Sequence, residues 1–396
     1  MMKHTLALIP LLTLAAHVSA ADWPHWRGPS HDGISPETIK PGAVPKVLWK
    51  ARAGTGFSSF SVAGGRVYTM GNEDDKDTVW CFDAASGKIV WSHSYPADLG
   101  DKYFEGGTTG TPTVDGGMVF TLSRWGDVFC FDAASGRVIW SRNVQKEHDI
   151  RIPDWGYAGS PLVSGDILLL NVGESGTALD KKSGKTLWTS KNKDAGYSTP
   201  TPYVANGKKC AAFGSGRTYV GIEIATGAVL WAQDWRTSYG VNAADAIVHD
   251  GQCFISSGYE KGCALLKLGT NPPALVWQSR VMRNMMSPSI LVGDHLYGVD
   301  GNEGKKPALK CIEWATGKEK WSFPDSGAGA ITIAGDQLVL LGEKGELCIG
   351  RLSPEGFQPG TRAKVLGGRC WTVPVVANGR LYCRNAAGDV ACVGVK

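Results

Sequence analysis

Aromatic, arginine and acidic side chains recur in the loops of this sequence in a pattern that suits the binding of a ligand. They stand at corresponding places in segments such as KYFEGGTTG (102–110), PDWGYAGSP (153–161) and GGRCWTVP (367–374). Aromatic and arginine side chains dominate the hot spots of binding surfaces, and they can stack on a flat ring, a peptide or a sugar. The candidate binding residues are Glu105, Arg124, Trp125, Trp155, Tyr157, Tyr197, Trp235, Tyr239, Asn242, Arg283, Asn284, Arg369 and Trp371.

Asp245 is the residue best suited to act as a general base or as a metal ligand. In the stretch NAADA it stands where other units of the sequence have a proline, namely Pro112, Pro161, Pro202, Pro288 and Pro374. A carboxylate in a strand that lines a channel could accept a proton or give one oxygen to a metal ion. A lone aspartate is also commonly a hydrogen-bonded turn residue, so both interpretations stay open.

Other catalytic motifs are absent from the sequence. It contains no GxSxG nucleophile elbow, no Walker phosphate-binding loop, no HExxH zinc motif and no CxxCH haem motif. Because these motifs are absent, the candidate residues named above predict a binding role rather than one of these chemistries.

The ten cysteines do not have the spacing of a zinc site. Five of them occupy the same position of their units, which indicates small buried apolar residues: Cys81, Cys130, Cys311, Cys348 and Cys392. One disulfide is predicted, because a turn at residues 387–388 would place Cys383 opposite Cys392.

The candidate loops belong to a repeat with a period in the forties. The stretch DAASGKIVW (83–91) returns as DAASGRVIW (132–140), and weaker copies begin at Asp180, Glu223 and Glu313. A period of this length with strand-rich content is typical of a β-propeller. The repeat tryptophans are Trp49, Trp91, Trp140, Trp188, Trp231, Trp277 and Trp321.

Each unit contains four short β-rich runs joined by turns, as residues 110–144 show most clearly. In the turn of the motif, the acidic side chain can accept hydrogen bonds from the backbone and the glycine can adopt a positive φ. The tryptophan is expected to pack between neighbouring blades, because one sheet cannot bury its own face. The predicted turn residues are Asp83, Gly87, Asp132, Gly136, Asp180, Gly184, Gly227 and Gly317.

Eight such units fill the chain, so we expect an all-β, eight-bladed propeller of four-stranded antiparallel blades. The last unit lacks its fourth strand, and a strand-like segment at 47–51 precedes the first complete unit. We expect this N-terminal strand to complete the eighth blade and close the ring. The propeller would then comprise residues 46–396, preceded by an N-terminal extension at 21–45.

Residues 1–20 have the basic start, apolar stretch and small-residue end of a secretory signal peptide. The apolar stretch is too short to span a bilayer, and no cysteine follows it for lipid attachment. We therefore expect a monomeric periplasmic or extracellular protein without a transmembrane segment or lipid anchor. The net charge of +4 is too small to predict binding to nucleic acid.

The repeat D-x-x-[ST]-G-x-x-x-W resembles that of the pyrroloquinoline-quinone-like (PQQ-like) β-propeller superfamily. The stretch DWPHWRGPSHDGIS (22–35) also resembles the opening of many secreted members. One branch, the quinoprotein dehydrogenases, holds PQQ and calcium in the central funnel. That resemblance implies oxidation of an alcohol or sugar, with rim aromatics around the quinone, arginines on its carboxylates and Asp245 as the base. The other branch contains non-catalytic propellers, such as the scaffold of the outer-membrane β-barrel assembly machinery.

Departures from the dehydrogenase branch favour the second branch. The sequence has no adjacent Cys-Cys pair, is shorter than those enzymes and offers no matching Glu/Asn/Asp calcium set. We expect a non-enzymatic scaffold without a cofactor, which binds a protein or peptide partner through its loop-rich rim. Two alternatives stay open, namely a PQQ- and calcium-dependent dehydrogenase and a carbohydrate-binding propeller.

Overall fold

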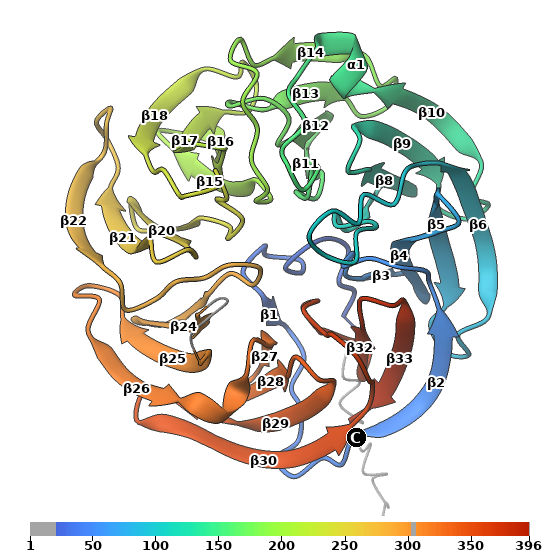
Figure 1. Cartoon of the computed structure of the whole chain (residues 1–396), viewed down its shortest axis with the longest axis vertical. Coiled ribbons are helices and arrows are strands. Elements are labelled where there is room, and N and C mark those ends of the chain that lie inside the picture. Colours follow the sequence, from blue (N-terminus) through green and yellow to red (C-terminus); the bar gives the residue numbers. More distant parts are fainter. Residues whose placement is uncertain (1–20, 302–305, 396) are drawn as a thin grey trace, which may run out of the picture.

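Eight four-stranded antiparallel sheets surround a central channel (Figure 1), which confirms the predicted fold class. The structure, a computed structural model, describes residues 21–301 and 306–395. The predicted signal peptide at 1–20 lies outside the described residues. Within the described part of the chain, no helix has the length and apolar character needed to cross a membrane.

The blades follow one another in chain order, and the first strand of each lies innermost (Figure 1). The first blade consists of β3 (Ser61–Ala63), β4 (Arg66–Glu73), β5 (Lys76–Asp83) and β6 (Ile89–Pro96), and the second of β7 (Thr113–Asp115), β8 (Met118–Leu122), β9 (Asp127–Asp132) and β10 (Val138–Asn143). The third blade consists of β11 (Leu162–Ser164), β12 (Ile167–Leu170), β13 (Thr177–Asp180) and β14 (Thr186–Thr189), and the fourth of β15 (Thr201–Ala205), β16 (Lys208–Gly214), β17 (Thr218–Glu223) and β18 (Val229–Asp234).

The remaining blades repeat this arrangement, and three additions to the four-stranded pattern occur among the described residues of the whole ring. The fifth blade consists of β19 (Ile247–His249), β20 (Gln252–Ser257), β21 (Gly262–Lys267) and β22 (Ala274–Ser279), and the sixth of β23 (Ile290–Val292), β24 (His295–Asp300), β25 (Ala308–Glu313) and β26 (Glu319–Phe323). The seventh blade consists of β27 (Ala330–Ala334), β28 (Gln337–Leu341), β29 (Glu346–Ser353) and β30 (Gly356–Lys364), and the eighth of β31 (Val375–Ala377), β32 (Arg380–Arg384), β33 (Asp389–Gly394) and β2 (Lys46–Arg52). The additions are β1 (Ile34–Ser35), α1 (Val144–His148) and a 3₁₀ turn, η1 (Pro324–Ser326).

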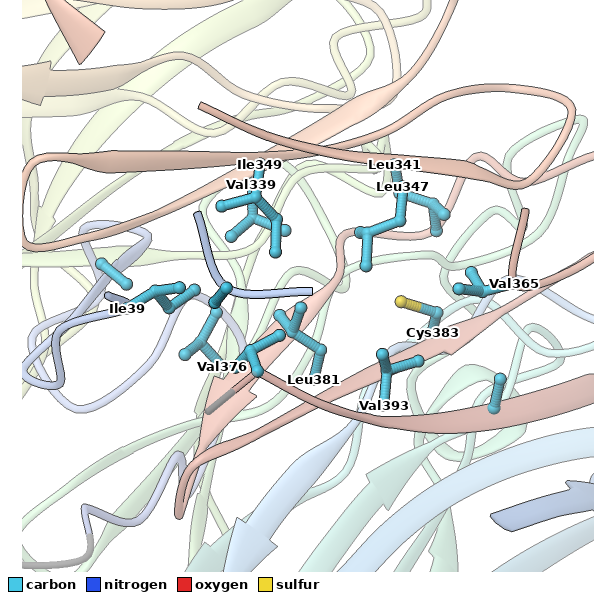
Figure 2. Packing of buried hydrophobic residues seen from close by; sticks show 14 of the residues in the cluster. Ile39, Val339, Leu341, Leu347, Ile349, Val365, Val376, Leu381, Cys383 and Val393 are labelled. Carbon is cyan, nitrogen blue, oxygen red and sulfur yellow. The ribbon is translucent and has the colours of Figure 1, made fainter. Parts of the chain in front are cut away.

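Strand composition follows strand position within a blade. The second strands have both faces covered by neighbouring blades, so they are nearly continuous apolar runs, such as ILLL in β12 and QLVLL in β28. The outer strands face solvent on one side and mix buried with exposed residues, as in β6. Figure 2 shows the resulting core between the seventh and eighth blades, where Val339 and Leu341 lie near Leu381 and Val393.

The ring is closed as predicted, by pairing of β2 with β33. The two strands are antiparallel, with Val47 opposite Val393 and Trp49 opposite Cys392. Arg384 strengthens the same seam from the eighth blade. Its buried guanidinium donates to the carbonyl oxygens of Ser58 (3.0 Å), Met70 (2.6 Å) and Gly54 (2.8 Å) in the first blade.

The repeated tryptophan and glycine meet across the boundary between blades. The Nε1 of Trp91 donates to the carbonyl oxygen of Ala133 (3.0 Å), and its ring covers Gly136 of the next blade. The carboxylate of Asp132 accepts bonds from the amide and hydroxyl of Ser135 and so fixes the same turn. Equivalent ring–glycine contacts occur at Trp49–Gly87, Trp140–Gly184, Trp188–Gly227 and Trp277–Gly317.

The boundary between the fourth and fifth blades departs from this rule. Trp231 donates to the hydroxyl of Tyr203 (3.1 Å) instead of a carbonyl of the following blade. The fifth blade has no D-x-x-[ST]-G turn before Trp277, so the usual acceptor and glycine are missing there.

The predicted disulfide between Cys383 and Cys392 is wrong. In the β32–β33 pair, Cys383 lies opposite Ala391 and Cys392 lies opposite Tyr382. A shift of one residue sends two side chains to opposite faces of a sheet, so each thiol joins a different core cluster. All ten cysteines are free and buried, which confirms the apolar role predicted for the repeated ones.

The N-terminal extension enters the channel and contacts most of the ring (Figure 1). Trp23 exchanges two backbone hydrogen bonds of 2.8 Å with Val62 of the first blade, and its side chain is 1% exposed. The short strand β1 pairs in parallel with β27, giving the seventh blade a fifth strand. Further bonds reach Val114, Ser289 and Val376 in the second, sixth and eighth blades.

Candidate ligand-binding funnel

A cavity of about 710 Å³ lies in the channel, between the loops that lead into the inner strands. Seven of the eight blades contribute lining residues, and the seventh is the exception among the residues described. The loops on this side differ from blade to blade, whereas the opposite side carries the uniform D-x-x-[ST]-G turns. The non-repeated chemistry of the protein is therefore concentrated at this end of the ring.

Trp26 closes the floor of the cavity. Its Nε1 donates to Oδ2 of Asp245 (2.6 Å), while Oδ1 of Asp245 accepts from the backbone N–H of Thr199 (2.7 Å). Trp26 lines the cavity and belongs to the extension that enters the channel (Figure 1), so we infer that the cavity, here called the funnel, is closed at this end.

Buried charges lie directly beneath this floor. Arg27 is 6% exposed and donates to the carbonyl oxygens of His31, Asp32 and Ser289 at 3.2, 2.8 and 2.9 Å. Burial raises the pKa of Asp245, while the nearby charge of Arg27 and the hydrogen bonds from Trp26 and Thr199 oppose that shift. Both oxygens of Asp245 thus already have structural partners.

The predicted alignment of Asp245 with the repeated prolines is wrong by one residue. Pro112 and Pro161 directly precede the inner strands β7 and β11, and Ala246 directly precedes β19. Asp245 therefore corresponds to Thr111 and Ser160.

The residues at this corresponding position form hydrogen bonds between blades. The hydroxyl of Thr111 accepts the amide of Ser59 (3.0 Å), and that of Ser160 accepts the amide of Thr111 (2.9 Å). Asp245 accepts the amide of Thr199 in the same way, so its carboxylate replaces a hydroxyl in a chain of inter-blade bonds.

One side of the funnel, here called the tyrosine wall, consists of Tyr103, Trp155, Tyr197, Tyr239 and Tyr259. Trp155 lies 6.1 Å from Tyr197, 6.3 Å from Tyr239 and 6.2 Å from Tyr103, with interplanar angles of 62°, 85° and 51°. Tyr103 and Tyr239 remain 74% and 60% exposed. Large aromatic rings left this exposed at the mouth of a cavity are typical of a binding site.

The other side, here called the phenylalanine wall, consists of Phe57, Phe104 and Trp371. Trp371 has Phe57 on one side (5.7 Å, 25°) and the guanidinium of Arg369 over its ring at 4.3 Å. Arg369 also forms an ion pair of 2.7 Å with Glu105. These contacts hold the wall in one arrangement before any ligand arrives.

The structure brings some of the predicted site residues together in the funnel. Six of the candidates line it directly: Trp155, Tyr197, Tyr239, Asp245, Arg369 and Trp371. Glu105 reaches it through its ion pair with Arg369. The other candidates are engaged in fixing the loops from behind.

Arg124 shows this supporting role clearly, since it is 2% exposed and donates to the carbonyl oxygens of Leu99 and Trp155 at 2.9 Å each. Trp125 donates to the carbonyl oxygen of Asp98 in the same way. The remaining candidates on this side of the ring have buried polar groups bonded to nearby backbone or hydroxyl groups: Tyr157, Trp235 and Asn242.

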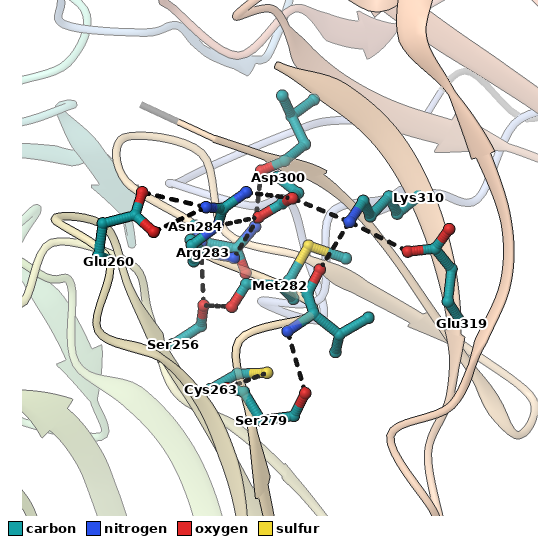
Figure 3. Close-up of polar contacts among 12 residues, drawn as sticks. Ser256, Glu260, Cys263, Ser279, Met282, Arg283, Asn284, Asp300, Lys310 and Glu319 are labelled. Atoms are coloured by element: carbon teal, nitrogen blue, oxygen red, sulfur yellow. Dashed lines mark hydrogen bonds and ion pairs between the residues drawn. The ribbon is translucent and has the colours of Figure 1, made fainter. Parts of the chain in front are cut away.

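Arg283 and Asn284 belong to a polar network between the fifth and sixth blades (Figure 3). Arg283 donates to Asp300 (2.8 Å) and to Glu260 (3.0 Å), and Lys310 adds a second cation 2.9 Å from Asp300. Although burial opposes it, the hydrogen bonds from Arg283 and Lys310 lower the pKa of Asp300. Glu319 adds a third carboxylate 3.0 Å from Lys310, and these mutual bonds hold the loops between the two blades.

Several lining residues were not predicted from the sequence: Trp26, Phe57, Tyr103, Phe104, Tyr259, Met285 and Met286. Tyr103 and Phe104 directly precede Glu105, so the segment that was singled out already contained them. Trp26 lies in an extension outside the repeat, and no periodic signal could have placed it in the channel.

The lining residues do not fit a calcium-bound quinone. Calcium takes six to eight oxygen ligands. Among the described residues, no three His, Cys, Asp or Glu side chains are grouped closely enough to hold a metal ion. Two carboxylates line the funnel: Asp245 is occupied by Trp26 and Thr199, and Asp154 lies 3.6 Å from Arg151.

Comparisons with known proteins agree with this architecture. A family model described as outer membrane protein assembly factor BamB matches residues 45–109 and 76–323. No curated protein sequence is significantly similar to the chain.

Solved structures share the fold at low sequence identity. BamB from Moraxella catarrhalis is 18% identical with a TM-score of 0.67, and the match covers 89% of this chain and 100% of that one. A europium-containing methanol dehydrogenase is 12% identical with a TM-score of 0.69, covering 94% and 98%. The quinohemoprotein alcohol dehydrogenase from Comamonas testosteroni is 13% identical with a TM-score of 0.67, covering 96% and 81%. At these identities, the similarity shows the fold alone.

Proposed function

Because the chain belongs to the family of the outer membrane protein assembly factor BamB, whose members are PQQ-like β-propellers, we propose that it is a non-enzymatic binding protein. Its ligand enters the funnel from the loop-rich rim and contacts the tyrosine wall. The proposal includes export directed by residues 1–20 and action as a monomer.

The observation that carries this proposal is the exposed tyrosine wall of a funnel that is already closed at its floor. The pocket is preformed, since the phenylalanine wall is held by Arg369 and Glu105 and the floor by Trp26. Preformed concave sites with aromatic linings are typical of ligand binding. Exposed rings such as Tyr103 and Tyr239 gain the burial that they lack in the free protein when a ligand covers them.

The state of Asp245 supports binding over catalysis. A general base needs a free oxygen within hydrogen-bond reach of the proton that it removes. Asp245 instead accepts from Trp26 and Thr199, and it joins the extension to the fifth blade. Dehydrogenase activity that depends on PQQ and calcium therefore forms no part of the proposal.

A thermal-shift and calorimetry screen of the purified chain from residue 21 tests the proposal. The panel contains PQQ with Ca²⁺, neutral and acidic oligosaccharides and short peptides, and dye-linked alcohol oxidation is followed in parallel. A ligand that binds only the folded state raises the Tm, and we expect such a ligand to lose affinity in Tyr239→Ala.

The matched control for this screen is Leu187→Ala, which removes a 50% exposed side chain from the outer strand β14. Binding that survives Tyr239→Ala as well as it survives Leu187→Ala contradicts a ligand site in the funnel. Alcohol oxidation with PQQ and Ca²⁺ that is lost in Asp245→Ala contradicts the non-enzymatic role.

A further inference from the structure

We propose that the funnel binds the end of a neutral oligosaccharide chain, with sugar rings against the tyrosine wall; this inference rests on the proposed function and names its ligand class. Four properties of the site support it: the pairing of its charges, the angles between its rings, the engagement of its backbone groups and its closed end.

Two of the three charged side chains that line the funnel form ion pairs before a ligand binds. Arg369 pairs with Glu105 at 2.7 Å, and Asp154 has Arg151 at 3.6 Å. The third, Asp245, already accepts hydrogen bonds from Trp26 and Thr199. A ligand with a net charge would lose its hydration on entering the funnel and would find no free opposite charge there. Such a transfer is unfavourable. The electrostatics therefore favour a neutral ligand.

The ring pairs that Trp155 forms are not parallel, so they do not offer a slot for a flat ligand. Trp155 meets Tyr103, Tyr197 and Tyr239 at 51°, 62° and 85°. Trp371, on the opposite wall, is already covered by Phe57 and Arg369. A saccharide ring is puckered and offers an apolar C–H face with hydroxyls at its edge. Tyrosine and tryptophan are amphipathic in the same sense, with an apolar face and a polar edge.

The backbone of the channel disfavours an extended peptide as the ligand. A peptide that adds to a sheet needs unpaired strand N–H and C=O groups. In the first, second and seventh blades, such groups of the inner strand are already used by the chain's own N-terminal extension, as Trp23 with Val62, Pro24 with Val114 and β1 with β27 show. Sugar hydroxyls need no unpaired backbone groups, by contrast. They can bind to oxygen and nitrogen atoms of the ion pairs at the rim without breaking those pairs.

The closed floor selects the end of a chain over its middle. The cavity of about 710 Å³ is within the range of ordinary ligand pockets, and Trp26 blocks passage through the ring. A polymer could not thread through such a funnel, so only its terminal residues would reach the floor.

Isothermal titration calorimetry with defined tetrasaccharides tests this inference. The probes are neutral gluco-, manno- and xylo-oligosaccharides and an acidic galacturonide of the same length. We expect at least one neutral probe to bind, the galacturonide to bind more weakly, and Tyr239→Ala to reduce affinity about tenfold or more, as for truncation of a hot-spot ring. Leu187→Ala is expected to bind as the wild type does.

Chain ends are tested with the same probes. Chemical blocking of the terminal sugar is expected to abolish binding. If the funnel instead bound sugars within the chain, blocking the end would leave the affinity unchanged. Absence of binding by every neutral probe, or stronger binding of the galacturonide, overturns the saccharide inference. If a peptide or a quinone then binds in a Tyr239-dependent manner, the proposed function survives; if no probe depends on Tyr239, both fail.

Discussion

The ring of Trp91 covers Gly136 of the next blade so closely that a Cβ at residue 136 would lie 2.5 Å from it. Gly136 also has a φ of 74°, a conformation that residues with a side chain rarely adopt. Two physical requirements therefore select glycine at this turn, and only the second is visible from a turn motif alone.

Gly136→Ala is expected to destabilise the propeller by about 3 kcal/mol, since it adds a steric clash to the backbone strain. Gly116→Ala is the matched control, because Gly116 has a φ of 55° and no atom within 4 Å of its Cβ position. The free energy of unfolding of this control is expected to fall by only about 1 kcal/mol. Urea unfolding measures both, and equal losses would show that contact with Trp91 does not matter.

Asp77 is expected to make stability depend on pH. It is fully buried, and burial raises its pKa to about 6 from an ordinary value near 3.8. The folded protein therefore holds this proton more tightly than the unfolded chain, so the free energy of unfolding falls as the pH rises between those two values. Above pH 6 the full penalty of a buried charge is present.

Asp77→Asn removes this titration and keeps an oxygen that can accept the bond from Asn72, which is 2.8 Å long. We expect the variant to gain stability over the wild type as the pH rises from 4 to 7, by up to about 3 kcal/mol. Urea midpoints across this range measure the difference. Parallel profiles for the two proteins would contradict a raised pKa.

Asp245→Ala is expected to destabilise the fold by about 2–4 kcal/mol, because it leaves the N–H groups of Trp26 and Thr199 unpaired beside the buried Arg27. Asp245→Asn, which keeps one acceptor oxygen, is expected to lose less. Asp154→Ala serves as the control, since Asp154 lines the same funnel but is exposed. Thermal unfolding distinguishes them, and a normal Tm for Asp245→Ala would contradict the structural role.

Removal of residues 21–35 is expected to expose the backbone groups that this segment covers. The amides of Val62 and Val114 donate to the carbonyl oxygens of Trp23 and Pro24 at 2.8 Å. Hydrogen exchange at these two amides should accelerate in the shortened protein, while that of strand β9 should change little. Unchanged exchange at Val62 would show that the segment does not protect the channel.

The fold could be predicted from the sequence because every blade repeats the same physical requirements. Counting the repeated units gave the number of blades, and the incomplete last unit gave the closure by β2. Errors of a single residue remained, since a periodic pattern fixes which segments are strands more firmly than their register. Cys383 and Cys392 missed each other by one position, and Asp245 was aligned one residue away from its true counterparts Thr111 and Ser160.

The funnel was less predictable than the fold, because the sequence shows residue types but not which way they point. Arg124, in the β8–β9 loop, and Trp155, in the loop before β11, lie on the same side of the ring, yet one is buried behind the rim and the other faces the cavity. Trp26 could not be found at all from the repeat. Its position follows from where the extension runs once the ring has closed.

The bond between Trp26 and Asp245 also makes the ring asymmetric about its central axis. The repeated strands of eight blades, without their differing loops, would offer a ligand eight nearly equivalent rotational poses. The extension crosses this axis and attaches at the one blade that has an aspartate where the first three blades have Ser59, Thr111 and Ser160. A molecule that reaches the floor therefore meets an asymmetric surface, and it can be recognised by its orientation as well as by its composition.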